Sequence, residues 1–115
     1  KSIEIVYGLR NFIGNANKFS KKNVFINLKS DSKITEVIIE DDGNGFPNDI
    51  LPKIGEPYLR SSSTNDKSKT GLGLGLFIGK TLLEKNFALV NCRNSETRTG
   101  AEVIIKWKNK DLFNI

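Results

Sequence analysis

Three glycines stand at alternate positions in the run KTGLGLGLFIGKTLLEKN, which covers residues 69–86. Gly71, Gly73 and Gly75 come just before an apolar helical pattern, where a glycine costs about 0.5–1 kcal/mol relative to alanine. A glycine run before a helix N-terminus presents backbone N–H groups, and the helix dipole there favours negative charge. The run therefore predicts a cradle for a phosphate chain, and a tight turn with a helix cap is the alternative.

A second cluster, DDGNGF, covers residues 41–46 and follows directly on a strand-like stretch. A carboxylate can accept a hydrogen bond from an exocyclic amine, so Asp41 could read an adenine amino group. Gly43 and Gly45 would let a planar group approach the backbone. A surface turn or a weak calcium site also fits, although the glutamate that closes an EF-hand loop is missing.

The third cluster lies on the first helical stretch, where Asn11, Asn15 and Lys18 are spaced i, i+4, i+7 and so share one face. Two amide oxygens one turn apart can help to hold Mg²⁺, and a lysine can meet phosphate charge. Taken alone, this pattern also fits an ordinary solvated face. The three clusters together supply a base reader, a metal holder and a phosphate cradle.

The amino-acid composition of the chain excludes several kinds of binding and catalysis. The chain has 115 residues and a net charge of +5, but its lysines are scattered and do not form the basic, aromatic-lined stripe of a single-strand nucleic-acid reader. It contains no histidine, which excludes histidine metal ligands and histidine acid/base catalysis within the chain. The one cysteine, Cys92, lies in the apolar run ALVNC and is expected to be a buried strand thiol.

No apolar run approaches the roughly 20 residues that a membrane helix needs. The chain begins without methionine, on what already reads as helix, and we therefore expect it to be a fragment of a longer protein. Residues 1–115 are expected to form one domain.

Hydrophobic periodicity predicts the elements. Residues 2–19 read as a helix, and residues 24–28 and 37–41 read as an antiparallel hairpin. One helical turn is expected over 48–53, a long polar loop over 55–71 and a helix from about Leu74 to Lys85, followed by strands over 88–93 and 101–107. This order predicts an α+β two-layer sandwich. The apolar residues assigned to the helix stripes are Ile3, Val6, Leu9, Ile13 and Ala16, with Phe12 and Phe19 beside them, and then Leu74, Ile78 and Leu82.

Four segments, in order and at their spacing, resemble the N, G1, F and G2 boxes of the histidine-kinase catalytic and ATP-binding domain: GLRNFIGNANKFS, EDDGNGF, GEPYLRS and GLGLGLFI. This domain belongs to the ATPase superfamily shared with gyrase B, MutL and the ninety-kilodalton heat-shock chaperone. The resemblance extends to the final TGAEVIIKW. It implies the Bergerat ATP-binding fold, in which helices cover one face of a mixed, mainly antiparallel sheet and a flexible lid closes over ATP.

The resemblance also implies roles for single residues. Asn15, together with Asn11, would bind Mg²⁺, Lys18 would contact phosphate, and Asp41 would hydrogen-bond the adenine amino group. A lid over residues 61–70 would cover the phosphates. The remaining nucleotide-binding positions implied by the boxes are Phe19, Gly43, Gly45, Phe46, Tyr58, Gly71, Leu72, Gly73, Leu74 and Gly75.

Two residues carry the expected catalysis. Hydrolysing members of the superfamily have a catalytic glutamate one turn before the metal asparagine, where this chain has Asn11, and an amide cannot take a proton from water. Arg60 matches a position able to stabilise the transferring phosphate. The resemblance therefore implies transfer to a partner, with ATP and Mg²⁺ as cofactors and a phosphoacceptor histidine on a dimerisation domain that precedes Lys1.

Among the kinases, the chain looks most similar to the RegB/PrrB group of redox-responsive sensor kinases of proteobacteria. That likeness implies a response regulator as the second partner, a homodimeric full-length protein attached to the inner membrane, and a cytoplasmic position for this domain, which could be inactive in isolation. The rival hypothesis is an anti-sigma-factor-like ATP-binding module that acts as a partner-switching serine kinase. A histidine-bearing hairpin upstream in the gene would favour the sensor kinase.

Overall fold

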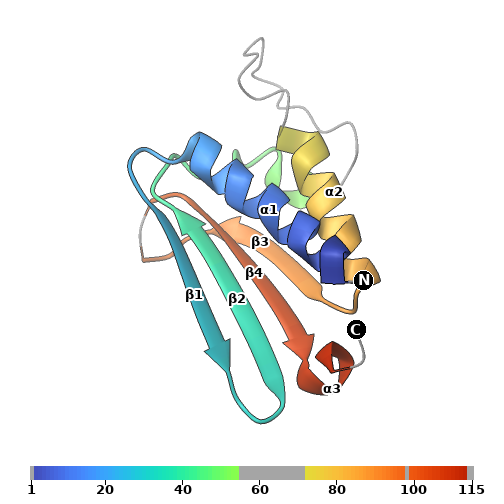
Figure 1. Ribbon diagram of the computed structural model, residues 1–115. Helices are drawn as coiled ribbons and strands as arrows, with labels where there is room; N and C mark the ends of the chain where they lie inside the picture. The colour runs from blue at the N-terminus through green and yellow to red at the C-terminus, as the bar shows by residue number, and fades with distance from the viewer. Residues whose placement is uncertain (1, 55–71, 98, 114–115) are drawn as a thin grey trace.

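A computed structural model describes residues 2–54, 72–97 and 99–113. Within these ranges the structure has three helices, one short 3-10 turn and four strands (Figure 1). Their bounds in chain order are α1 Ser2–Phe19, β1 Val24–Ser30, β2 Ile34–Asp41, η1 Leu51–Lys53, α2 Leu72–Lys85, β3 Leu89–Asn94, β4 Ala101–Lys108 and α3 Asn109–Leu112.

The four strands form one sheet in the order β1-β2-β4-β3. All three pairings are antiparallel, so the part of the expected mixed sheet that is described contains no parallel pair. The two hairpins predicted from the alternating pattern are confirmed, and β2 and β4 pair at the centre, where Ile39 lies opposite Val103. Because the two strands are antiparallel, the last residues of β2 lie beside the first residues of β4, with Glu40 opposite Glu102.

Helices α1 and α2 lie side by side across one face of the sheet, as Figure 1 shows, and the core fills the space between the two layers. The predicted two-layer α+β sandwich is confirmed. Burial of the apolar side chains between the two layers is the main contribution to the stability of this packing. The largest fully buried side chains are Phe12, Ile39, Ile50, Leu76, Leu83 and Ile105.

The buried faces of both helices differ from the predicted stripes. In α1, Ile3 and Val6 are 58% and 49% exposed, because the contact line with α2 passes through Gly8. A Cβ added at Gly8 would lie 2.7 Å from Cγ of Leu83, which shows how closely the helices approach there.

In α2 the buried seam likewise passes through a glycine, Gly79, between Leu76 and Leu83, while Ile78 of the predicted stripe is 37% exposed. A periodic count of apolar residues overlooks glycine, so it did not place Gly8 or Gly79 in the seams. Ala16 of the predicted α1 stripe and the neighbouring Phe12 are buried as expected.

Smaller differences lie at the element ends. The helical turn expected over 48–53 is a turn followed by the 3-10 helix η1, with a proline in its first positions. The four-residue helix α3 follows β4 directly and was not predicted. Within the described ranges, no helix has both the length and the apolar character to cross a membrane.

Candidate functional site

A pocket of about 250 Å³ opens where the second half of α1, the end of β2 and the start of β4 meet. Small-molecule sites commonly measure about 300–1,000 Å³, so this pocket suits one end of a ligand, such as a planar base, with the remainder outside. It unites residues from the first helix and from the DDGNGF cluster, as the sequence suggested. The lining residues are Asn15, Phe19, Asp41, Asn44, Gly45, Phe46, Pro47 and Ala101.

Asp41 is the most buried polar residue of the pocket, with 3% of its surface exposed. Its Oδ1 accepts hydrogen bonds from the backbone N–H of Gly43 at 2.8 Å and of Ala101 at 3.4 Å. Within the described residues its Oδ2 accepts none, and no fully buried side-chain oxygen there is left without a partner. Asp41 lines the pocket, so Oδ2 is the oxygen that can accept a hydrogen bond from a ligand there.

The glycines of the DDGNGF loop have packing reasons of their own. A Cβ at Gly43 would collide with the carbonyl oxygen of Phe19, and this glycine does not line the pocket. Gly45 does line it, and its φ of +82° is a left-handed conformation that favours glycine. Phe46 is nearly fully buried and forms part of the wall. The loop is thus pressed against the end of α1, which gives the pocket a fixed rim.

The polar face of α1 divides between two places. Asn15 and Phe19 line the pocket, whereas Lys18 is exposed with its Nζ 5.5 Å from the centre of the Phe19 ring. Asn11 lies outside the pocket: its Nδ2 donates to the carbonyl of Tyr7 at 2.8 Å. The row from residue 19 back to residue 11 therefore leads from the pocket along α1.

The glycine run meets this row. A Cβ at Gly75 would lie 3.8 Å from Oδ1 of Asn11, so the first turn of α2 faces the polar row of α1. The prediction that α2 begins near Leu74 is corrected: it begins at Leu72, which places Gly73 and Gly75 inside the helix. Glycine is disfavoured in a helix but not excluded, and the intervening leucines are good helix formers.

Several sequence-predicted residues lie outside the described ranges, among them Gly71 and the whole expected lid. The aromatic Tyr58 and the cation Arg60 belong to the same segment. Of the side chains of Leu72 and Leu74 nothing is described. Their assigned roles stay predictions.

Two residues that organise the pocket were missed by the sequence analysis. Asp42 accepts hydrogen bonds from the backbone N–H groups of Lys22, Asn23 and Lys21, which lower the pKa of its carboxyl group and tie the α1–β1 turn to the end of β2. Asn94, at the end of β3, binds the backbone of Phe46 through both ends of its side-chain amide. Both act across long stretches of sequence, so no local pattern signals them.

Cys92 lies half-buried on β3, and burial raises the pKa of its thiol to about 12. The predicted strand position of Cys92 is confirmed, and its side chain is partly rather than fully buried. A thiol with so high a pKa is a poor nucleophile at neutral pH.

The comparisons with known proteins agree with the geometry. A model of the family described as histidine kinase-, DNA gyrase B-, and HSP90-like ATPase matches residues 1–111. Sensor histidine kinase RegB of Cereibacter sphaeroides is 37% identical over 119 residues, which cover 90% of this chain and 26% of RegB. Sensor protein KdpD of Clostridium acetobutylicum is 36% identical over 86 residues, which cover 73% of this chain and 10% of KdpD.

Solved structures show the same fold. The mycobacterial sensor histidine kinase MprB superimposes with a TM-score of 0.78 at 24% identity, covering 94% of this chain and 74% of that structure. Full-length ShkA, solved in complex with AMPPNP, gives a TM-score of 0.70 at 24% identity, covering 90% of this chain and 21% of that structure. Among the curated relatives, the chain matches about a quarter of the length of each RegB sequence.

Proposed function

The chain belongs to the family of histidine kinase-, DNA gyrase B- and HSP90-like ATPases, and from this premise we propose that it is the catalytic part of a two-component sensor histidine kinase. In this role it binds ATP with Mg²⁺ and transfers the γ-phosphoryl group to a histidine on a separate dimerisation domain. The observation that carries the proposal is the buried carboxylate of Asp41, which lines a base-sized pocket and has one oxygen held by the backbone.

The base end of the nucleotide follows from that carboxylate. Oδ2 of Asp41 accepts the hydrogen bond of the adenine amino group, while the backbone N–H of Gly43 holds Oδ1 in place. Phe19 and Phe46 add aromatic, apolar surface to the lining of the pocket. A pocket with one anchored acceptor and aromatic walls suits a planar base that carries an exocyclic donor.

The phosphate end extends along α1. Asn15 at the pocket and Asn11 one turn earlier carry the amide oxygens that would hold Mg²⁺, and both are hard donors of the kind that this ion takes. When bound, Mg²⁺ supplies charge neutralisation to the phosphate oxygens. The first turn of α2, close to Asn11, offers the positive end of a helix dipole, and the exposed ammonium of Lys18 adds a further cation.

The chain's own residues favour transfer over hydrolysis. In the transfer the bond between the γ-phosphorus and its bridging oxygen breaks, a phosphorus–nitrogen bond forms at the histidine, and ADP leaves. Asn11 stands where a general base would have to activate water, and an amide cannot accept that proton. The chain holds no histidine, so the phosphoacceptor must lie outside it. Arg60 is assigned to stabilise the charge on the transferring group.

The further partners rest on the same proposal. A sensor kinase passes its phosphoryl group to a response regulator and acts as a homodimer through its dimerisation domain. We assign a membrane-attached sensor part to the sequence before this chain, which would place the chain on the cytoplasmic side. The rival, a partner-switching serine kinase resembling anti-sigma factors, receives no support from the relatives described above, which are named as sensor proteins.

Calorimetric titration with ATP and with ADP, each with and without Mg²⁺, tests the proposal. The wild-type domain should bind both nucleotides, and Asn15→Ala should abolish the gain in affinity that Mg²⁺ gives. Asn17→Ala is the matched control, because Asn17 is exposed on the same helix and does not line the pocket. A folded wild-type domain that binds neither nucleotide would overturn the proposal, and Mg²⁺ dependence that survives in Asn15→Ala would remove the metal assignment.

A further inference from the structure

Asn94 makes a two-point contact with the loop that forms the pocket wall. The backbone N–H of Phe46 donates to Oδ1 of Asn94 at 2.7 Å, and Nδ2 of Asn94 donates to the carbonyl oxygen of Phe46 at 3.1 Å. One side chain thus satisfies both backbone groups of one loop residue, as a neighbouring strand would do. A Cβ at Gly45 would lie 2.6 Å from the same Oδ1, so the amide is seated directly against the loop.

The residue that Asn94 binds, Phe46, lies within the loop segment 44–47 that forms one wall of the pocket. Residues 44–47 are four consecutive lining residues of the pocket, and Phe46 is 5% exposed. Without the amide of Asn94, the N–H and carbonyl of Phe46 would lose their partner while remaining largely buried, which is the costly case for a polar group. The wall could recover these hydrogen bonds only by moving toward water, and its position relative to Asp41 would then change.

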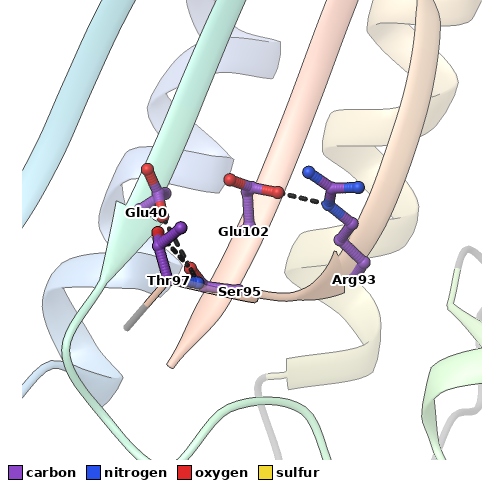
Figure 2. Close-up of polar contacts among 5 residues, drawn as sticks. All are labelled: Glu40, Arg93, Ser95, Thr97 and Glu102. Carbon is purple, nitrogen blue, oxygen red and sulfur yellow. Dashed lines mark hydrogen bonds and ion pairs between the residues drawn. The ribbon is translucent and has the colours of Figure 1, made fainter. Parts of the chain in front are cut away.

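The strand that carries Asn94 is anchored on the other face of the sheet. Figure 2 shows Ser95 directed toward Glu40, to which its hydroxyl donates at 2.9 Å, and Arg93 paired with Glu102. Glu40 and Glu102 are cross-strand neighbours on β2 and β4, and both are largely buried. The residues before and after Asn94 are therefore tied to the two central strands.

The same strand end also reaches the base-reading carboxylate. Asn94 pairs with Ala101 in the β3–β4 ladder, and the N–H of Ala101 points to Oδ1 of Asp41 at 3.4 Å. The Asn94–Ala101 pair thus connects the hydrogen bonds on Phe46 with the carboxylate of Asp41. The two sides of the pocket take their positions from a common frame.

We propose that Asn94 is a positioning residue for the nucleotide: by holding the Gly45–Phe46 wall at a fixed distance from Asp41, it sets both the affinity for the base and the preference for adenine over guanine. The inference rests on the proposed function, because it presupposes that the pocket receives a purine base. Asn94 itself does not line the pocket, so it acts through the wall.

The test compares dissociation constants for ADP and GDP, measured by calorimetry on the isolated domain, with melting curves as a check of folding. Asn94→Ala should raise the Kd for ADP about tenfold, the effect of losing about one net hydrogen bond. It should also lower the ratio of the Kd for GDP to the Kd for ADP, because a loosened wall accepts either base. A role in stability alone would lower the melting temperature without changing this ratio.

Two further variants complete the design. Asn94→Asp keeps an acceptor for the N–H of Phe46 but cannot donate to its carbonyl, so it should restore part of the ADP affinity. Asn91→Ala is the matched control, since Asn91 is exposed on the same strand and should leave both constants unchanged.

Equal ADP affinity in wild type and Asn94→Ala, or an unchanged base ratio in a folded variant, would overturn the inference. If Asn94→Ala does not fold, the ratio measured for Asn94→Asp decides in the same way. A wild-type domain that binds no ADP would instead overturn the proposed function, and the inference with it.

Discussion

Replacing Asp41 by asparagine removes one negative charge from the pocket while keeping the shape of the side chain. In the wild type the backbone N–H of Gly43 donates to Oδ1 of Asp41 at 2.8 Å. The amide oxygen of the asparagine can accept the same hydrogen bond, so the loop should keep its conformation and the variant should fold. The second position becomes an NH₂ group, which would meet the adenine amino group donor to donor. A hydrogen bond to a charged group contributes about 1.5–3 kcal/mol, so the Kd for ADP should rise roughly 10- to 150-fold.

Calorimetry with two nucleotides makes this prediction sharp. Inosine diphosphate carries a carbonyl where ADP carries the amino group, so Asp41→Asn should bind it more tightly than wild type does, while ADP binding falls. Asp111→Asn on α3 is the charge-matched control and should leave both constants unchanged, because Asp111 lies away from the pocket. Equal ADP affinity in Asp41→Asn and wild type, with both proteins folded, would refute the assignment of the base reader.

The further predictions concern two glycines, Gly100 and Gly14, and two titratable side chains, Cys92 and Asp42. Gly100 has a φ of +116° and a Cβ there would collide with the Asp41 carbonyl, so Gly100→Ala should lose at least about 1–3 kcal/mol of unfolding free energy in urea. Gly14→Ala, where a Cβ meets nothing within 4 Å, should instead gain about 0.5–1 kcal/mol, and equal effects of the two changes would contradict this account. The pKa of Cys92 is raised from 9.0 to about 12, so the folded state holds its proton and stability should fall as pH rises from 9 to 12; iodoacetamide labelling of the folded domain at pH 9 as fast as that of the unfolded chain would disprove it. Hydrogen bonds from the backbone lower the pKa of Asp42, so its contribution to stability is present above the ordinary value of 3.8 and is lost as pH falls below it; urea midpoints of Asp42→Asn should depend less on acid than those of wild type, and parallel curves would speak against the bonds.

The fold could be predicted from the sequence because the patterns that indicate its strands and turns lie in short, continuous segments. Alternation in VFINL and EVIIED predicts strands, and the turn residues between them predict the hairpin that pairs β1 with β2. The order of elements then leaves few topologies, and the two-layer sandwich is among them. The helix seams were predicted only in part because they run through Gly8 and Gly79, whose small size allows the close contact and whose lack of a side chain hides it from a hydrophobic count.

The site was predictable only where chemistry is written into adjacent residues. Asp41 stood out because a carboxylate at a strand end followed by glycines is unusual, and the structure places it in the pocket with Asn15 and Phe19. Asn94 lies 48 positions from the peptide that it binds, and nothing near it in the sequence announces that contact. Side-chain hydrogen bonds to backbone across a fold depend on the final register of the sheet, which local patterns do not contain.

The central claim is that this chain delivers the γ-phosphoryl group of ATP to a histidine outside itself. The most direct measurement incubates the full-length protein with Mg²⁺ and γ-labelled ATP and follows the label on the protein after acid and after alkali, since a phosphorus–nitrogen bond is broken by acid and survives alkali. The account predicts an acid-labile label on a residue before Lys1, which Asn15→Ala reduces and Asn17→Ala preserves. An acid-stable label, or release of the phosphate into solution by the isolated domain without any label on protein, would contradict it.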